Sequence, residues 1–229
     1  MAKFYLRKKI GDRVVNGHPW VFANELGDSE GEYKAGDIVD VHSSNGTYIG
    51  SGYINPSSLI RIRILTRNKQ EPINEAFFYN KLLAAWEYRK QLGYVENCRL
   101  IFGEADGMPA LIIDKFNDYF VIQSMALGID LWKQAIVDAL QKIFNPKGIY
   151  ERNDVPVREL EGLQQIKGFL SEPFDTNIII NENGLQFHVD IANGQKTGYF
   201  LDQQDNRRAI ANIVKGASVL EAFCYTGTF

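Results

Sequence analysis

The residues with the clearest chemical potential lie in VLEAFCYTGTF (219–229), where an acid and a glycine flank an apolar run. Glu221 falls near the end of an expected strand, and Gly227 falls in the turn after it. A glycine lets the backbone approach a ligand closely, and a following helix amino terminus favours a carboxylate on that ligand. Phe223 and Tyr225 stand where a dinucleotide loop has glycines, which counts against a nicotinamide site. The run indicates another kind of cofactor loop, with an ordinary strand and glycine turn as the alternative.

The two cysteines, Cys98 and Cys224, lie far apart and show no CxxC or histidine spacing. This pattern predicts neither a disulfide framework nor a zinc site, so we expect reduced thiols and no metal. Hydrophobic residues make up 45% of the chain and charged residues 23%, as in ordinary soluble proteins. No apolar stretch is long enough to span a bilayer, and the first residues lack the apolar core of a signal peptide. We expect a cytoplasmic protein without a membrane partner.

The net charge of −3 is unevenly distributed. Residues 1–70 hold ten Lys and Arg against seven Asp and Glu, and residues 71–229 hold fifteen against twenty-one. Such asymmetry indicates a polyanion-binding end, although two solvated faces of a small domain would give the same balance. The candidate RNA-binding residues are the basic side chains of this end, namely Arg7, Lys8, Lys9, Arg13, Arg61 and Arg63.

The first 70 residues read as short strands separated by turns, which is typical of a small barrel or sandwich. Asn45 and Gly46 between two apolar alternations predict a hairpin, because both residues tolerate positive φ. Residues 59–65 alternate aliphatic side chains with arginines, which predicts a strand with one buried and one basic face.

Residues 71–190 predict an α+β domain with helices on one face of a mainly antiparallel sheet. Apolar spacing predicts helices at 74–93 and 130–144. Turn residues predict hairpins at 115–118 and at Asn183 and Gly184.

Residues 191–229 predict the start of an α/β domain. The polar run GQKTGYFLDQQDNRR (194–208) should lead into a helix with Asp202 as its N-cap and Ile210, Ile213 and Val214 on its buried side. Residues 218–223 should then form a buried strand.

The two motifs together resemble a known family. GQKTGYFLDQQDNR followed closely by EAFCYTGTF is similar to the motifs of ribosomal RNA large-subunit cytosine-C5 methyltransferases, which join an amino-terminal PUA domain to a class I S-adenosylmethionine (SAM) domain. GHPWVFANEL (17–26), PALIIDKFNDYFVIQ (109–123) and YERNDVPVRELEGL (150–163) extend the similarity over essentially the whole chain. Glu221 departs from the usual aspartate or asparagine, and Gln204 from a common arginine.

The resemblance implies an α+β multidomain protein: a PUA-like RNA-binding β-barrel at 1–70, a central α+β domain at 71–190, and the beginning of an incomplete Rossmann-like methyltransferase domain at 191–229. It also implies a set of SAM-binding residues: Gln195, Lys196, Thr197, Phe200, Asp202, Glu221, Phe223, Tyr225 and Gly227. Tyr199 with Phe200 could line a pocket or form a hydrophobic staple. Lys196, Arg207 and Arg208 could meet RNA phosphate or the SAM carboxylate, or be ordinary surface charges.

The implied reaction needs a cysteine thiolate that adds to C6 of cytosine, so that C5 becomes nucleophilic toward the SAM methyl group. The family's acid for the SAM ribose, its substrate loop and its attacking cysteine have no counterpart in the sequence. Neither Cys98 nor Cys224 suits that role, so we expect no catalytic residue, no methyl transfer and no SAM bound by these 229 residues. The expected function is binding of structured, ribosomal RNA by the amino-terminal part of a methyltransferase. The alternative is a non-catalytic RNA- or protein-binding module; a homodimer is left open.

Overall fold

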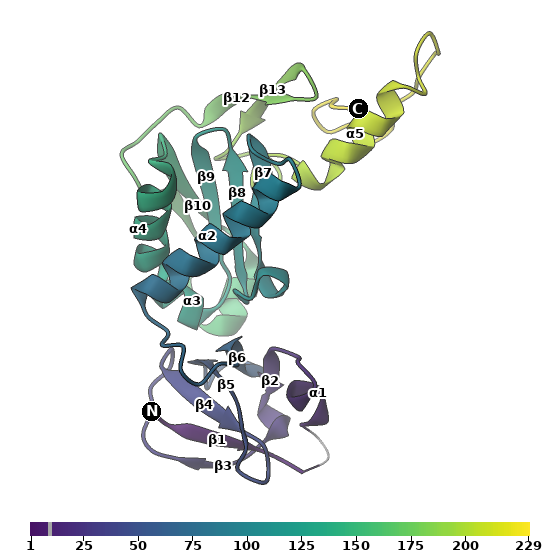
Figure 1. Cartoon of the computed structure of the whole chain (residues 1–229). Helices are drawn as coiled ribbons and strands as arrows, with labels where there is room; N and C mark the ends of the chain where they lie inside the picture. The colour runs from purple at the N-terminus through teal and green to yellow at the C-terminus, as the bar shows by residue number, and fades with distance from the viewer. Residues whose placement is uncertain (9–10) are drawn as a thin grey trace.

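The computed structural model describes residues 1–8 and 11–229, and it shows two sheet-containing domains in succession (Figure 1). The amino-terminal sheet has the strand order β2-β6-β5-β4-β1-β3. Its elements are β1 (Lys3–Leu6), the short helix α1 (Asp12–Val15), β2 (Trp20–Phe22), β3 (Leu26–Glu30), β4 (Ile38–His42), β5 (Tyr48–Ile54) and β6 (Ile60–Thr66). β1 and β4 pair in parallel, and the other neighbours are antiparallel. The hairpin predicted at Asn45 and Gly46 joins β4 to β5, with Gly46 at φ +88°.

The apolar alternation of these strands forms one core, in which Val39 and Val41 of β4 and Ile62 and Ile64 of β6 are buried. The basic outer face predicted for 59–65 is wrong at Arg63, whose side chain is buried and paired with Glu161 of the second domain. Arg63 does lie on the face of β6 that the alternation predicts to point away from the core. The neighbouring domain covers that face and buries the side chain.

The central sheet has the order β11-β10-β9-β8-β7 and is mainly antiparallel, as predicted, with β9 and β10 as its parallel pair. Its strands are β7 (Asn97–Phe102), β8 (Leu111–Phe116), β9 (Tyr119–Ser124), β10 (Gly148–Asn153) and β11 (Ile166–Phe169). The predicted turn between β8 and β9 is formed with Asn117 at φ +52°.

Helices cover one face of this sheet. α2 (Glu75–Gln91) starts at Asn74, whose side-chain oxygen accepts a hydrogen bond from the Phe77 amide at 3.0 Å. The second predicted helix is divided at Trp132 into α3 (Leu127–Leu131) and α4 (Lys133–Phe144). Apolar side chains from α2 and α4 pack on the sheet in one core: Phe77, Phe78, Leu82, Ile136, Val137 and Leu140. Because both helices lie on this side (Figure 1), the opposite face is left to the carboxyl-terminal third of the chain.

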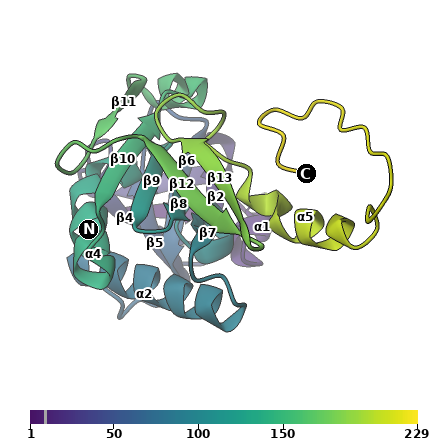
Figure 2. The ribbon, with the colours of Figure 1, turned by 90° about the horizontal axis from the view of Figure 1, so that it is seen from above.

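The second face of the sheet is covered in part by a hairpin of β12 (Asn177–Glu182) and β13 (Leu185–Asp190). It turns at Asn183 and Gly184, as predicted, and both residues have positive φ. Ile178, Ile180 and Val189 of the hairpin form a core with residues of the sheet, including Val121 and Tyr150. The hairpin crosses the top of the sheet in Figure 2 and carries the chain toward residues 194–211.

The last segment differs most from the prediction. A 3₁₀ helix (Leu201–Gln203) leads into α5 (Gln204–Ala211), so Asp202 lies inside a helical turn and is not the N-cap of α5. Ile213 is predicted to lie on the buried side of this helix, but it is 79% exposed. Residues 218–223 form no strand within the described chain and run in an open loop (Figure 2). A parallel strand depends on neighbours on both sides, and the described residues supply none at this position. No helix among these residues has the length and apolar character needed to cross a membrane.

Candidate functional site

The GQKTG sequence forms a tight turn that only glycine permits at its two ends. The Gly194 amide donates to the Asp190 carbonyl at 2.9 Å, and a Cβ added at Gly194 would lie 2.4 Å from that oxygen. Gly198 has φ +118°, and its added Cβ would lie 3.0 Å from the same carbonyl. Between them, Lys196 adopts φ +60° and is exposed. The two glycines thus hold Lys196 at the tip of a closed turn.

A buried polar network fixes this turn to the sheet. The Thr197 hydroxyl donates to Asp114 at 2.5 Å, and the guanidinium of Arg99 donates to both oxygens of the same carboxylate at 2.9 and 3.0 Å. Asp114 and Thr197 are fully buried. Arg152 donates to the carbonyls of Ile191 and Gly194 at 2.8 and 2.9 Å. The turn is therefore held by β7, β8 and β10, and Thr197 serves as an anchor.

A cavity of about 760 Å³ lies beside the turn. Lys196, Phe200 and Asp202 line it from the turn and the segment that follows, and α2, β7 and β8 contribute Tyr88, Arg99 and Ile112, among others. The structure thus brings three of the nine predicted cofactor-binding residues to one cavity. Burial lowers the pKa of Arg99, but its hydrogen bond to Asp114 and the charges of Asp114 and Asp202 outweigh this effect and raise the pKa.

The second motif touches the first through Tyr225 and through its last residues, where the Phe229 ring lies 5.7 Å from the Arg207 guanidinium. The Tyr225 hydroxyl accepts a hydrogen bond from the Gln195 amide at 2.7 Å, and the Tyr225 ring meets the edge of Phe200 at 5.8 Å between centroids. Glu221, Phe223 and Gly227 do not line the cavity, and Phe223 is fully exposed. The structure therefore joins the two motifs through Tyr225 and Phe229 and leaves the predicted acid and glycine in the carboxyl-terminal loop, outside the cavity.

Tyr199 and Arg207 belong to a buried cluster that their sequence positions did not indicate. Arg207 is buried and binds both carboxylate oxygens of Glu182 at 2.5 and 2.9 Å, with its guanidinium 4.7 Å from the centre of the Tyr199 ring. Arg207 is thus neither a surface charge nor available to an RNA phosphate. Arg208 is exposed and donates to the Asn183 side chain at 2.9 Å. Only helical periodicity, which places residue 207 on the inner side of α5, could have indicated this burial.

The cysteines lie in opposite environments. Cys98 is buried in β7, and burial raises the pKa of its thiol to about 11, against the lowering effect of Lys115 and Arg89. Cys224 is exposed in the carboxyl-terminal loop. The described residues contain no cluster of His, Cys, Asp and Glu able to hold a metal ion.

The predicted basic residues are divided between surface and interior. Arg7 and Lys8 are exposed, while Lys9 lies outside the described residues. Arg13 pairs with Glu25 at 2.7 Å, and Arg61 donates to the Pro56 carbonyl. With Arg63 in the domain junction, Arg7 and Lys8 are the clearest surface cations of the described part of this set.

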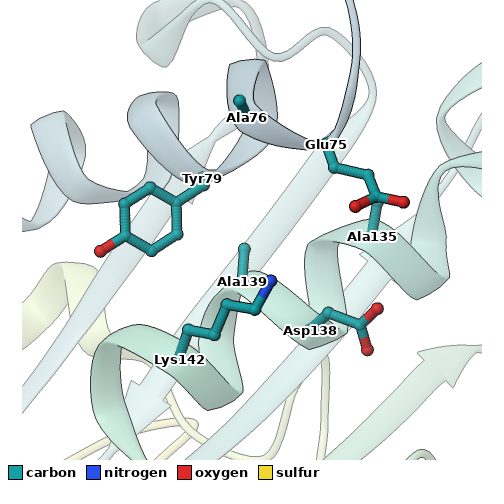
Figure 3. Close-up of a pocket in the computed structure, with 7 residues that line it drawn as sticks. All are labelled: Glu75, Ala76, Tyr79, Ala135, Asp138, Ala139 and Lys142. Atoms are coloured by element: carbon teal, nitrogen blue, oxygen red, sulfur yellow. The ribbon is translucent and has the colours of Figure 1, made fainter.

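A smaller cavity of about 260 Å³ lies between α2 and α4. Figure 3 shows Ala76, Ala135 and Ala139 as short side chains between the helices, with Glu75, Asp138 and Lys142 around them. It is a gap left by small side chains between packed helices, and it shares no residue with the motifs.

Comparison with known proteins assigns both ends of the chain. Residues 4–67 match a PUA-like domain, and residues 164–229 match an S-adenosylmethionine-dependent methyltransferase domain. The chain thus combines a PUA-like domain with methyltransferase sequence. The second match begins 27 residues before the domain boundary predicted at 191 and includes the hairpin, the turn and the carboxyl-terminal loop.

Curated relatives resemble the whole chain. The ribosomal RNA large subunit methyltransferase I of Aliivibrio fischeri is 39% identical over 232 residues, a match that spans all of this chain and 59% of the relative. The protein of the same name from Shewanella denitrificans is 42% identical over 221 residues, or 93% of this chain and 55% of the relative. The chain spans somewhat more than half the length of these relatives.

Solved structures confirm the fold. A candidate SAM-dependent methyltransferase from Streptococcus mutans superposes with a TM-score of 0.74 at 18% identity, covering 93% of this chain and 54% of that one. A candidate methyltransferase crystallised with S-adenosylhomocysteine (SAH) gives a TM-score of 0.75 at 18% identity and the same coverage. The PUA-like domain and the α+β multidomain architecture are thus confirmed.

Proposed function

We propose that residues 1–229 provide RNA binding and one wall of the SAM site in a methyltransferase that acts on C5 of a cytosine in ribosomal RNA. The observation that carries the proposal is the turn at 194–198, which two glycines and the buried Thr197 hold beside a cavity. The relatives' names supply the ribosomal RNA substrate, and the PUA-like match supplies the RNA-binding domain.

The side chains at the cavity suit part of SAM. Lys196 and Asp202 present a cation and an anion to one space, which complements the carboxylate and the ammonium of an amino acid. Phe200 offers a ring on which a flat heterocycle could stack. SAM, when bound, supplies the methyl group; Gln195, Lys196, Thr197, Phe200 and Asp202 would hold or shape its site, together with Tyr225. Glu221, Phe223 and Gly227 join this proposal only if the carboxyl-terminal loop closes over the turn.

Residues 1–229 alone are proposed to bind RNA without methylating it. A thiolate must attack C6, and the raised pKa of the buried Cys98 leaves its thiol protonated near neutral pH. Cys224 is exposed in the same loop as Tyr225 and lies outside the cavity. The domain limits 1–70, 71–190 and 191–229 are part of the proposal.

The RNA-binding part is tested by the salt dependence of affinity. Arg7→Ala and Lys8→Ala remove two exposed cations, so binding to a structured ribosomal RNA fragment should weaken and its salt slope should become shallower by about one per lost phosphate contact. Glu32→Gln, at an exposed acid of the same domain, is the control and should not flatten the slope. Unchanged affinity and slope in the double variant would contradict the proposal and favour a protein-binding module.

The cofactor part is tested by calorimetry with SAM. Residues 218–229 are largely exposed, so binding has to supply the free energy of ordering them, on the order of 1 kcal/mol or more per residue. We therefore expect affinity weaker than the low micromolar range. A low micromolar dissociation constant would show that the turn and its cavity hold the cofactor without that loop.

A further inference from the structure

The wall that α2 and β7 give to the 760 Å³ cavity carries two aromatic rings that are not part of the hydrophobic core. Tyr88 on α2 is 54% exposed and Phe102 at the end of β7 is 55% exposed. Both line the cavity, and neither belongs to the three hydrophobic clusters. Exposed rings on one concave surface are typical of a binding site, since isolated surface apolar residues are not expected to converge.

Each ring has a guanidinium beside it that is held by a carboxylate. Arg89 lies 5.3 Å from the centre of the Tyr88 ring and pairs with Asp106 at 2.6 Å. Arg99 lies 5.4 Å from the centre of the Phe102 ring and pairs with the buried Asp114 at 2.9 Å. The ion pairs fix the two planar cations next to the two rings. Rings and guanidinium planes are the groups on which proteins stack unpaired nucleobases.

The charge balance of the cavity lining indicates whether it suits a nucleobase or the phosphate backbone of RNA. Its three cations, Arg89, Arg99 and Lys196, are matched by three acids: Asp106, Asp202 and Asp205. A groove that follows an RNA backbone is strongly basic, whereas this cavity has no net charge. A neutral base with hydrogen-bond donors and acceptors on its edge matches such a lining. The Gln123 amide nitrogen donates to the Arg152 carbonyl, so its side-chain oxygen is the group that can accept from that edge.

From these observations we propose that Tyr88 and Phe102 form a stacking platform for an unpaired nucleobase of the RNA, on the wall that the central domain gives to the cavity. The cavity volume lies within the range of about 300 to 1,000 Å³ that is usual for small-ligand sites. The RNA backbone would pass outside the cavity, whose lining has no net charge. The inference rests on the proposed function for its ligand, and it assigns to the central domain a contact with RNA separate from that of the PUA-like domain.

The test measures binding of a short single-stranded RNA, and of the same RNA in a duplex, to the whole 229-residue chain. Phe102→Leu and Tyr88→Leu remove the rings but keep apolar bulk. Each should weaken single-strand binding about tenfold, as expected for loss of a base–ring stack, and leave the salt slope unchanged. Phe169→Leu is the matched control, because Phe169 is 41% exposed on β11 at the opposite edge of the sheet. Phe102→Trp should retain affinity.

Photocross-linking with 5-iodouridine in the same RNA gives a second readout that does not depend on the variants. We expect cross-links at Tyr88 or Phe102. If wild-type chain binds RNA with the salt dependence described above, yet both leucine variants bind equally well and no cross-link falls in the cavity, the platform is refuted and the proposed function stands. If the wild-type chain binds neither RNA, both proposals are refuted.

Discussion

The Arg63 guanidinium donates to the Glu161 carboxylate at 2.8 Å, and this buried pair joins the amino-terminal sheet to the central domain. Ser58 and Asn55 donate to the same carboxylate at 2.5 and 2.9 Å, so both of its oxygens are satisfied. In the same 3₁₀ helix (Pro156–Glu161), the buried Arg158 pairs with Asp130 of the central domain at 2.9 Å. The helix therefore links the two domains through two ion pairs. It supplies the acid, Glu161, to the pair with the amino-terminal domain and the base, Arg158, to the pair with the central domain. A junction of this kind fixes the distance between the two surfaces proposed to bind RNA.

Replacing Glu161 by Gln should destabilise the junction. The substitution leaves the Arg63 charge buried without its counter-ion, and breaking a buried pair in this way costs about 3 kcal/mol or more. We expect a lower midpoint of denaturant unfolding and new protease cleavage between residues 66 and 75. Glu159→Gln, an exposed acid of the same 3₁₀ helix, should have little effect. Equal stability of the two variants would show that the pair does not hold the domains together.

The same junction should make stability fall in acid. Burial raises the pKa of Glu161, but the hydrogen bond and charge of Arg63 outweigh it, so the pKa is lowered from 4.5. Hydrogen bonds from Arg158 and Ser124 likewise outweigh burial and lower the pKa of Asp130 from 3.8. A carboxyl with a lowered folded-state pKa contributes stability that is fully present above its unfolded value and is lost as pH falls toward the folded one.

We therefore expect unfolding free energy to fall as pH decreases below about 4.5, more steeply in the wild type than in Glu161→Gln. Denaturant titrations at pH 3.5, 4.5 and 6 would measure the difference. Parallel pH profiles for the two proteins would exclude Glu161 as a source of the loss of stability in acid.

Local turn chemistry predicted much of the fold. The hairpins predicted at Asn45 and Gly46 and at Asn183 and Gly184 are both formed, because glycine and asparagine readily adopt positive φ. Gly46, Asn183 and Gly184 adopt it in the structure. The partners of the buried charges were not predictable. Arg63 pairs with a residue 98 positions away, and Thr197 bonds to Asp114 over 83 positions. A single sequence shows alternation but not which surface will cover the polar face.

The candidate site was predictable to a similar extent. The motifs at 194–208 and 219–229 were recognisable from their residues, whereas the cavity wall of Tyr88, Arg99 and Phe102 comes from a helix and a strand some 90 residues or more earlier in the chain. The strand expected at 218–223 failed because a buried parallel strand is stabilised by neighbours rather than by its own sequence.

The two thiols should differ sharply in alkylation. Cys98 is buried with a pKa raised to about 11, and Cys224 is exposed. Iodoacetamide at pH 7.5 should modify Cys224 and spare Cys98, because only the thiolate reacts. Intact mass would show one adduct in native protein and two after denaturation, and Cys224→Ser should give none in native protein. Rapid modification of Cys98 in the folded chain would overturn its assignment as a non-nucleophile.

Thr197→Val should loosen the turn that carries Lys196. The substitution keeps the side-chain shape but removes the hydroxyl donor to the fully buried Asp114, which costs about 1 to 3 kcal/mol. Thr197→Ser retains the donor and should lie close to the wild type. Hydrogen exchange should then report faster exchange at the Gly194 and Gly198 amides, which close the turn at 2.9 and 3.0 Å. Because Arg99 and Arg152 also hold this region, we expect local opening before global unfolding. Uniform loss of protection across β7 and β8, with the turn no more affected than the strands, would mean that Thr197 stabilises the sheet as a whole and does not specifically position Lys196.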